Sequence, residues 1–358
     1  MRIAFDVSPL SHPRTGVGNY VLGSLRGLLE AAAESGDEVV PFGISGRWGA
    51  GHLAGALAGL PARPRTVTLP LAHAWRTAWS RAGRPAAERF LGPLDVLHFW
   101  DWMYPPQRAG VRATMIHDLV PLRFPEWTTA RTRRMHRAKY RHAARTCDVI
   151  LVNSRFTGEE VVELLRVPAE RVRVAYPGVE PRFRPDGEAS DLGRPYALTL
   201  ATLEPRKNLA TLLDAHAALA GELALAVAGG AGWGEQPELA RDGVLPLGYV
   251  ADEEVPRLLR GAAVFVYPSL FEGFGMPVVE AMACGVPCVV STHPSLDEAC
   301  GDAAVRVDPR SAEGVAEGIR EALARRDELV PRGLAHAARF TWRGTGDAFL
   351  AAYRDAAA

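Results

Sequence analysis

Short apolar runs alternate with longer amphipathic stretches along most of the chain. Runs rich in Val, Ile and Leu are typical of buried strands, and the stretches between them have the spacing of helices. In the first half, the expected strands cover residues 2–7, 38–44, 96–100, 113–119, 149–154 and 172–177. This alternation predicts parallel sheets with helices packed on them, which is an α/β architecture.

The alternation is broken at residues 177–195, a polar stretch that contains several Pro and Gly residues. It then resumes with expected strands at 196–203, 223–230, 244–250, 263–269 and 287–292, and with helices from about Asn208, Asp252 and Pro277. Such a break predicts a domain boundary. We expect a first Rossmann-like, doubly wound domain over 1–182, a second over 183–340, and a C-terminal helix over 341–358 that packs back on the first domain.

In one region of the first half, the pattern of apolar and polar residues indicates neither helices nor strands clearly. Residues 45–89 contain scattered Gly, Pro, Trp and Arg with weak periodicity, and this region is left partly unassigned.

Length and composition limit the class of protein. A chain of 358 residues exceeds the usual size of one core, and it has no uninterrupted apolar run long enough to span a bilayer. The chain starts directly in a strand-like run without the pattern of a secretory signal, so a cytoplasmic protein is expected, with attachment to the inner face of the membrane left open. The four cysteines, Cys147, Cys284, Cys288 and Cys300, have no spacing typical of a metal or disulfide framework.

The net charge is zero, but the charge is unevenly distributed. Residues 1–182 contain 25 Lys and Arg against 16 Asp and Glu, and the remainder contains 16 against 25. The most basic stretch, residues 131–145, is expected to form one helix. Its cations either form a solvated surface or bind an anionic acceptor or acidic lipid headgroups. Nucleic acid is not an expected partner, because no known binding motif accompanies the basic residues.

The stretch SLFEGFGMPVVEAMACGVP (269–287) is the first candidate for chemistry. It follows an expected strand and so lies at the carboxyl edge of a sheet, where open α/β sheets bind ligands. Gly273 and Gly275 permit tight turns, and the amides of the following helix suit phosphate or sugar oxygens. Glu280 can accept hydrogen bonds from a vicinal diol such as ribose, and Glu272 faces another part of the ligand. Taken singly, a glutamate of this kind is more often a solvated loop residue (Glu272) or an exposed helix residue (Glu280).

The second candidate is TLEPRKNL (202–209), where another strand ends. Arg206 and Lys207 place two cations at a sheet edge, which suits a diphosphate leaving group without a metal ion. An isolated pair of this kind is more often surface decoration.

Two candidates lie in the first domain. In RTGVGNY (14–20), Gly16 and Gly18 open the first helix and could bring amides close to an anion, although a simple glycine turn explains them as well.

In MIHDLVPL (115–122), His117 and Asp118 reach a strand end, where His117 could form a hydrogen bond with a substrate hydroxyl or act as a general acid or base. A structural His–Asp turn is the alternative.

Taken together and in this order, the four motifs resemble the retaining glycosyltransferases of family 4, which have the two-domain GT-B fold. Nearly the whole chain takes part in the resemblance, including VNSRFT (152–157), YPGV (176–179) and LGYV (247–250). The Glu-x7-Glu spacing of Glu272 and Glu280, with the surrounding Gly, Met and Pro residues, is its most specific part.

The resemblance implies a role for each candidate residue, with the two domains facing each other across a cleft. Arg206 and Lys207 would bind the donor diphosphate, and Glu280 would bind the ribose. Glu272 would bind the donor sugar, which His117 would approach from the opposite wall. The remaining donor contacts would be backbone amides or loop residues, namely Gly16, Gly18, Gly248, Tyr249, Val250, Gly273, Phe274 and Gly275. No metal or cofactor is expected, in agreement with the lack of an Asp-x-Asp motif.

The resemblance also limits the substrates. The start DVSPLSHPRTGVGNY is similar to a subgroup with many mannosyltransferases and polysaccharide-building enzymes, which favours a GDP-mannose-like donor over a UDP-sugar. The acceptor would be a hydroxyl of a glycan, a lipid-linked molecule or a small molecule. The alternatives are a GT-B epimerase or phosphorylase, a non-catalytic protein that binds nucleotide sugars, and a glycosidase that uses both glutamates, which would leave Arg206 and Lys207 without a role.

Overall fold

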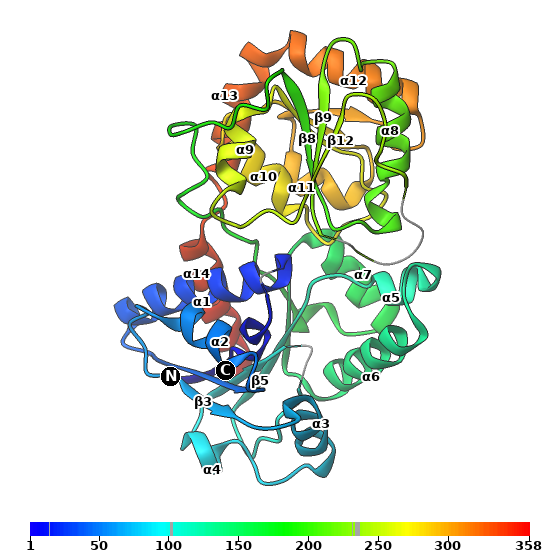
Figure 1. Ribbon diagram of the computed structural model, residues 1–358. Coiled ribbons are helices and arrows are strands. Elements are labelled where there is room, and N and C mark those ends of the chain that lie inside the picture. Colours follow the sequence, from blue (N-terminus) through cyan, green and yellow to red (C-terminus); the bar gives the residue numbers. More distant parts are fainter. Residues whose placement is uncertain (14, 101–102, 231, 233–236) are drawn as a thin grey trace. The chain divides into compact units, whose positions relative to one another are not determined.

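The computed structural model describes residues 1–13, 15–100, 103–230, 232 and 237–358, which form two α/β units (Figure 1). The first unit consists of residues 1–178 and 341–358, and the second of residues 179–340. Each unit has its own parallel sheet with helices packed on it, of seven and six strands respectively. The predicted fold class, two Rossmann-like parallel-sheet domains, is confirmed.

The sheet of the first unit has the order β3-β2-β1-β4-β5-β6-β7, with every pair parallel. Its strands are β1 (Arg2–Asp6), β2 (Glu38–Ser45), β3 (Arg65–Thr68), β4 (Val96–Phe99), β5 (Val111–Ile116), β6 (Val149–Val152) and β7 (Val172–Val174). All six strands expected in this half are present. The seventh, β3, lies at the edge of the sheet and falls in the region that could not be interpreted.

Alternating strand residues face two helical layers. The helices of this unit are α1 (Gly16–Ser35), α2 (Ala50–Leu57), α3 (Ala72–Ala82), α4 (Glu88–Leu91), α5 (Val120–Arg123), α6 (Ala130–Thr146), α7 (Arg155–Leu165) and α14 (Trp342–Ala357). His98 of β4 stacks on Phe349 of α14, whereas the next residue, Phe99, belongs to a core with Tyr140 of α6 and Val161 of α7. The basic stretch 131–145 does form one helix, α6.

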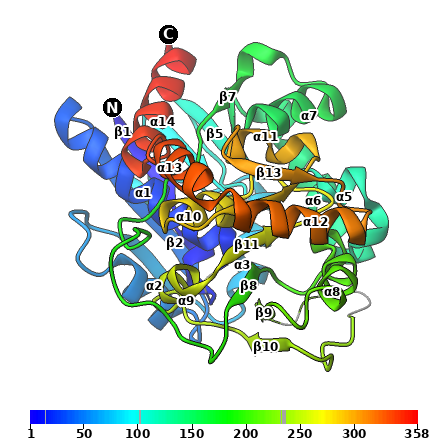
Figure 2. The same ribbon diagram turned by 90° about the horizontal axis from the view of Figure 1, so that it is seen from above.

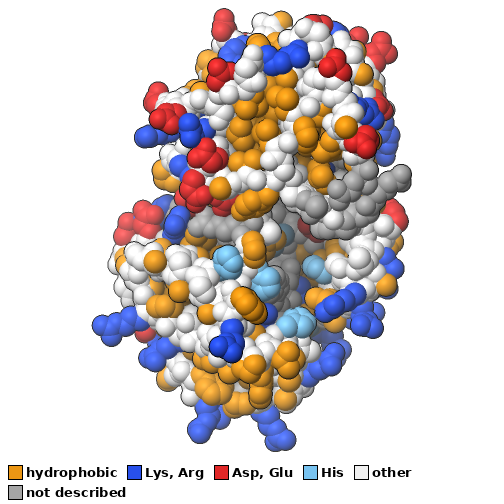
Figure 3. All heavy atoms as spheres, in the orientation of Figure 1, with side chains coloured by type: hydrophobic (Ala, Val, Ile, Leu, Met, Phe, Trp, Pro, Cys, Tyr) orange, Lys and Arg blue, Asp and Glu red, His pale blue; other side chains and the backbone are white. Residues whose placement is uncertain are grey.

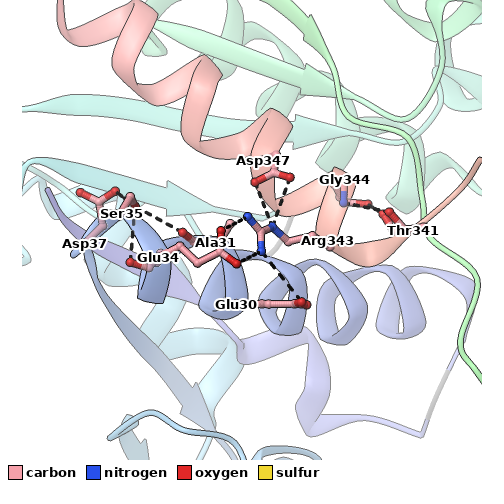
Figure 4. Close-up of polar contacts among 11 residues, drawn as sticks. Glu30, Ala31, Glu34, Ser35, Asp37, Thr341, Arg343, Gly344 and Asp347 are labelled. Atoms are coloured by element: carbon pink, nitrogen blue, oxygen red, sulfur yellow. Dashed lines mark hydrogen bonds and ion pairs between the residues drawn. The ribbon is translucent and has the colours of Figure 1, made fainter.

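The first helix and the last helix of the chain lie side by side in both ribbon views (Figures 1 and 2). Glycine makes this close approach possible. A Cβ atom on Gly27 would lie 1.7 Å from the carbonyl oxygen of Trp342, and one on Gly346 would lie 2.1 Å from the carbonyl oxygen of Gly27. Arg343 fixes the exposed side of the contact, with its guanidinium bonded to both oxygens of Glu34 at 2.5 and 2.6 Å and to Asp347 (Figure 4).

The sheet of the second unit has the order β10-β9-β8-β11-β12-β13, and Figure 2 labels these strands except β12. Its strands are β8 (Tyr196–Leu200), β9 (Ala224–Ala228), β10 (Val244–Gly248), β11 (Val264–Tyr267), β12 (Cys288–Ser291) and β13 (Ala304–Val307). The five expected strands are present, and β13 was not predicted.

Helices cover both faces of this second sheet (Figure 1). They are α8 (Leu209–Ala217), α9 (Val255–Gly261), α10 (Met276–Ala283), α11 (Asp297–Cys300), α12 (Ala312–Ala324) and α13 (Arg326–Ala337). Leu212 of α8 and Ile319 of α12 belong to one core with Val266 of β11, and α10 packs against α13. Pro277 is the second residue of its helix, one place later than its expected position.

Two properties expected of the whole chain can be compared with the described residues. All four cysteines are free and buried. Among these residues, no helix combines the length and the apolar character that a bilayer span requires.

Substitution of Gly27 by Ala should destabilise the first unit. The added methyl group has no room against the backbone of α14, and overpacking of this kind costs on the order of 1–3 kcal/mol. Chemical denaturation followed by circular dichroism measures the change.

The matched control is Gly55→Ala in α2, where a Cβ atom meets nothing within 4 Å. There, the better helix propensity of Ala should leave stability unchanged or raise it by up to about 1 kcal/mol. Equal stability of the two variants would contradict the packing described for α1 and α14.

Candidate active site

Strand order brings two of the candidate motifs together. β8 and β11 are parallel neighbours, so the loops that follow them leave the same edge of the sheet. The loop after β8 carries Arg206 and Lys207 in a short 3-10 helix, and the loop after β11 carries Glu272. A backbone bond from the amide of Leu270 to the carbonyl of Arg206, 2.8 Å long, ties the two loops directly.

The side chains of these loops form an ion cluster. Glu272 is buried, with 6% of its surface exposed, and each of its oxygens meets one cation. Arg206 donates to Oε2 at 2.5 Å, and the Lys207 Nζ donates to Oε1 at 2.6 Å. Arg206 also pairs with the buried Glu204 at 2.8 Å. The cluster therefore holds two carboxylates and two cations, so its formal charges balance.

Neighbouring groups hold the cluster in place. Lys207 donates a second bond to the hydroxyl of Tyr267, 2.7 Å away, at the end of β11. The amide of Glu272 donates to the Ser295 hydroxyl at 3.0 Å. Asn208 has a left-handed backbone, and its side-chain amide bonds the carbonyls of Pro268 and Pro309, which fixes the end of the 3-10 helix. The geometry is thus preorganised by the fold.

The pKa values of the two carboxyl groups in the cluster are shifted in opposite directions. Burial alone would raise the pKa of Glu272, but the charges of Arg206 and Lys207 outweigh it and lower that pKa to about 2. Burial raises the pKa of Glu204, and Arg206 opposes the rise. Burial and the charge of Arg206 lower the pKa of Lys207, which Glu272 offsets. Glu272 is accordingly an ionised carboxylate at neutral pH.

Glu280 lies away from this cluster. It is one turn into α10 and partly exposed, and its carboxyl group makes no hydrogen bond within the described part of the chain. Burial raises its pKa to about 8, while the charge of Arg182 pulls it down and those of Asp252 and Glu180 push it up. At neutral pH the group is therefore largely protonated, and it can both donate and accept a hydrogen bond.

The predicted loop residues of this unit occupy two places. Gly273, Phe274 and Gly275 form the bend between β11 and α10, and Gly275 has a positive φ of 103° that favours glycine. Gly248 ends β10 at the outer edge of the sheet, with φ of 64°, and Tyr249 is 64% exposed beside Val250. The structure thus puts these two groups at the carboxyl edge but on different strands.

In the first unit, Gly16 and Gly18 begin α1, behind the N-cap Thr15. Arg14 of the same motif lies outside the described residues. A Cβ atom on Gly16 would meet nothing within 4 Å, and one on Gly18 would meet only the Thr15 side chain at 3.9 Å. Packing within the described residues therefore does not require glycine at either position.

His117 follows β5 and is held between aromatic rings. Its ring stacks on Trp100, with centroids 5.7 Å apart, and meets the edge of Tyr20 at 5.0 Å. Burial lowers its pKa to about 4, although Asp118 opposes the shift. Its Nε2 atom is buried and has no hydrogen-bond partner among the described residues. His117 is therefore neutral at pH 7, and the hydrogen-bonding capacity of its buried Nε2 atom is unused within the described residues.

Sequence reasoning missed three participants in these sites. Glu204 and Tyr267 complete the ion cluster, and Trp100 holds His117. The first two stand at or just beyond a strand end, as Arg206 and Glu272 do, and this position is the signal that could have identified them.

Comparison with known proteins gives the following matches. Residues 182–337 match the profile of the family described as "Glycosyl transferases group 1", and residues 16–183 match that of "Glycosyltransferase Family 4". The chain is 29% identical over 388 residues to O-antigen chain mannosyltransferase B of Escherichia coli, covering 99% of this chain and all of that protein.

Solved structures share the fold. A glycosyltransferase from Rickettsia africae superposes with a TM-score of 0.70 at 13% identity, covering 99% of this chain and 98% of that one. HepE of Anabaena, solved in complex with UDP and glucose, has a TM-score of 0.68 at 16% identity and 98% coverage of both chains.

The raised pKa of Glu280 predicts how stability depends on pH. Below its ordinary value of 4.5, the group is protonated in both folded and unfolded chains and costs nothing. As pH rises from 4.5 to about 8, the unfolded chain ionises first, so stability falls, by at most about 1.4 kcal/mol per pH unit. Glu280→Gln should remove this loss, so its advantage over the wild type should grow between pH 5 and pH 8.

Urea unfolding at several pH values measures that difference. Glu317→Gln serves as the matched control, because Glu317 is an exposed glutamate of α12. A constant difference between Glu280→Gln and the wild type across this range would show that the pKa of Glu280 is not raised in the folded chain.

Proposed function

We propose, because this chain belongs to the family 4 glycosyltransferases, that it transfers a hexosyl group from a nucleoside diphosphate sugar to a hydroxyl group. We further propose that the anomeric configuration is retained and that no metal ion is needed. The observation that supports this most is the buried pairing of Arg206 and Lys207 with Glu272 at a sheet edge. Two fixed cations there can neutralise a departing diphosphate, which is the largest charge that develops in such a reaction.

The balanced charge of the cluster gives Glu272 a specific part in donor binding. Without a ligand, its carboxylate neutralises both cations. The phosphate oxygens of a donor would take over those cations, and Glu272 would then turn to hydroxyl groups of the donor sugar. The exchange keeps both cations paired at every stage, and the sugar hydroxyls would supply hydrogen bonds to the Glu272 carboxylate in place of the cations.

Glu280 would bind the ribose of the donor. Its carboxyl group has no partner within the described residues and is largely protonated at neutral pH. A protonated carboxyl can donate to one ribose hydroxyl and accept from the other. Binding through a neutral group avoids bringing another negative charge near the diphosphate. Gly248, Tyr249 and Val250 are the proposed contacts of the base, and the amides of Gly273, Phe274 and Gly275 are proposed contacts of the sugar.

His117 would act on the same donor from the first unit. Because its imidazole is neutral, we assign it a hydrogen bond between Nε2, which has no partner among the described residues, and a sugar hydroxyl, rather than an ion pair. Gly16 and Gly18 would place backbone amides against the diphosphate, and an added Cβ atom at Gly16 would meet none of the described residues within 4 Å.

For the substrates, GDP-mannose is the donor we favour. The relative with full coverage is named as an O-antigen chain mannosyltransferase, and the start of the chain is similar to mannosyltransferases. A UDP-sugar is the second candidate, because HepE, a structural neighbour, was solved with UDP and glucose. The acceptor would be a glycan, a lipid-linked molecule or a small molecule with a free hydroxyl.

Three alternatives are compatible with the same fold. A phosphorylase would act on a glycoside and phosphate, and an epimerase would release nucleotide without any acceptor alcohol. A non-catalytic binding protein would hold the donor without turnover. Release of nucleoside diphosphate that depends on an added acceptor alcohol would exclude all three.

Lys207→Ala should lower the rate of acceptor-dependent transfer by at least about a hundredfold, because one of the two cations facing the leaving group is lost. Glu272 keeps its pair with Arg206 in this variant, so the fold should persist. The release of nucleoside diphosphate in the presence of donor and acceptor measures the rate.

Arg241→Ala is the matched control, because Arg241 forms an exposed ion pair with Asp214 in the same unit. It should retain nearly wild-type transfer. If Lys207→Ala also turns over within about twofold of the wild type while remaining folded, the proposed role of the cations is wrong.

A further inference from the structure

Large hydrophobic side chains are exposed in one part of the first unit. Eight are exposed among the described residues, and five of these fall within residues 47–90, namely Trp48, Val67, Leu71, Trp75 and Phe90. Trp48 is 98% exposed and Leu71 is 81% exposed. Isolated exposed hydrophobics are ordinary, but a group of large ones usually marks an interaction surface.

Several of these side chains belong to α3, α4 or the residue that precedes α3. Trp75 and Trp79 are spaced four residues apart, which places them on one side of α3, and Leu71 is the residue that caps the start of this helix. The ring of Trp79 meets that of Phe90 in α4 edge-on, with centroids 6.1 Å apart. Trp48 is close to the same corner of the sheet, because it follows β2 by three residues, as Leu71 follows β3, and the ends of β2 and β3 are paired.

The charge of this region is almost entirely positive. Between Glu38 and Asp95 the sequence contains seven arginines and one acidic residue, Glu88. Six of the arginines are exposed and form no ion pair within the described residues: Arg47, Arg63, Arg65, Arg81, Arg84 and Arg89. In Figure 3, hydrophobic side chains gather at the end of the first unit where Figure 1 draws α3 and α4, with Lys and Arg side chains around them.

The basic helix α6, which the sequence suggested as a docking surface, lacks the apolar component. Met135 is the one large hydrophobic residue exposed on this helix, all of which is described, and it is 44% exposed. Lys139 is buried and donates to the carbonyl of Met115 at 2.7 Å. The helix therefore offers exposed arginines without aromatic anchors.

We infer that the exposed face of residues 47–90, called here the Arg–Trp surface, docks this protein on a lipid bilayer with anionic headgroups. Trp75, Phe90 and Leu71 would enter the interfacial region, where amphipathic aromatic rings are favoured. The arginines around them would bind the headgroup phosphates, each contributing to an attraction that salt weakens. This binding needs neither donor nor acceptor, so it stands apart from the proposed transfer reaction.

A second copy of the chain fits this surface less well. A two-fold symmetric contact brings the same patch of each copy together, so the unpaired arginines of one copy would face those of the other. Like charges at such a contact repel. An anionic membrane supplies the opposite charge over the whole surface.

Flotation of the full chain with vesicles tests the inference. The wild type should float with vesicles of phosphatidylcholine and phosphatidylglycerol and remain unbound with phosphatidylcholine alone. The double variant Trp75→Ser with Phe90→Ser should lower the bound fraction by about tenfold or more, because its two anchors are lost. Its melting temperature should stay unchanged, since both side chains are exposed. Met135→Ser, the matched substitution on α6, should bind like the wild type.

Removal of three positive charges from each basic region in turn decides which region binds the membrane. Replacing Arg81, Arg84 and Arg89 by Gln should weaken binding to the anionic vesicles by about tenfold or more, and replacing Arg131, Arg134 and Arg137 of α6 by Gln should have little effect. Both triple variants remove the same charge.

Three results would overturn the inference. The first is failure of the wild type to bind anionic vesicles. The second is loss of binding in the α6 variant alone. The third is a wild-type oligomer in sedimentation that dissociates in the Trp75→Ser, Phe90→Ser variant, which would assign the surface to a second copy. Because flotation uses no sugar nucleotide, a protein inactive in transfer can still pass this test, and an active one can fail it.

Discussion

The buried ion cluster of Glu272 with Arg206 and Lys207 is the interaction on which the proposed site depends. It exists because β8 and β11 are neighbours in a parallel sheet, so that two loops far apart in the sequence leave the same edge. A buried carboxylate with fewer cations would be costly to ionise. With two cations, its pKa falls to about 2, and the edge of an otherwise apolar sheet becomes a fixed arrangement of charges.

The two glutamates of the Glu-x7-Glu spacing are in different electrostatic environments. Glu272 is ionised and paired, whereas Glu280 is largely protonated and makes no hydrogen bond within the described residues. One bend and one helical turn separate them, and this short distance along the chain is enough to direct them to different neighbours. Such a division suits a ligand with an anionic part and a diol, which is the chemistry of a nucleoside diphosphate sugar.

Much of the fold could be read from the sequence, because most strands are buried on both faces and are therefore continuous apolar runs. The exceptions have a physical reason. β13 alternates between buried and partly exposed residues in a run of four, and β3 is an exposed edge strand, so neither forms an apolar run. Residues 45–89 lacked a readable period because large side chains such as Trp48 and Trp75 face outward.

The residues of the site could also be predicted from the sequence, but the ion pairs that they form could not. Arg206, Lys207 and Glu272 could be found because each follows a strand. That Glu272 bonds both cations depends on which strands are adjacent, and strand order is a property of the whole fold. The neutral state of His117 likewise depends on burial against Trp100, a contact between residues of two different strand ends.

The central claim is that Glu272 occupies the cations that a donor diphosphate would use. Calorimetric titration with GDP, UDP, ADP and dTDP, in the wild type and in Glu272→Gln, tests this claim most directly. The variant keeps the shape of the side chain and removes its charge, so the preferred nucleotide should bind about fivefold more tightly or better. If Glu272→Gln binds that nucleotide no more tightly than the wild type, or if neither protein binds any of the four, the claim is contradicted.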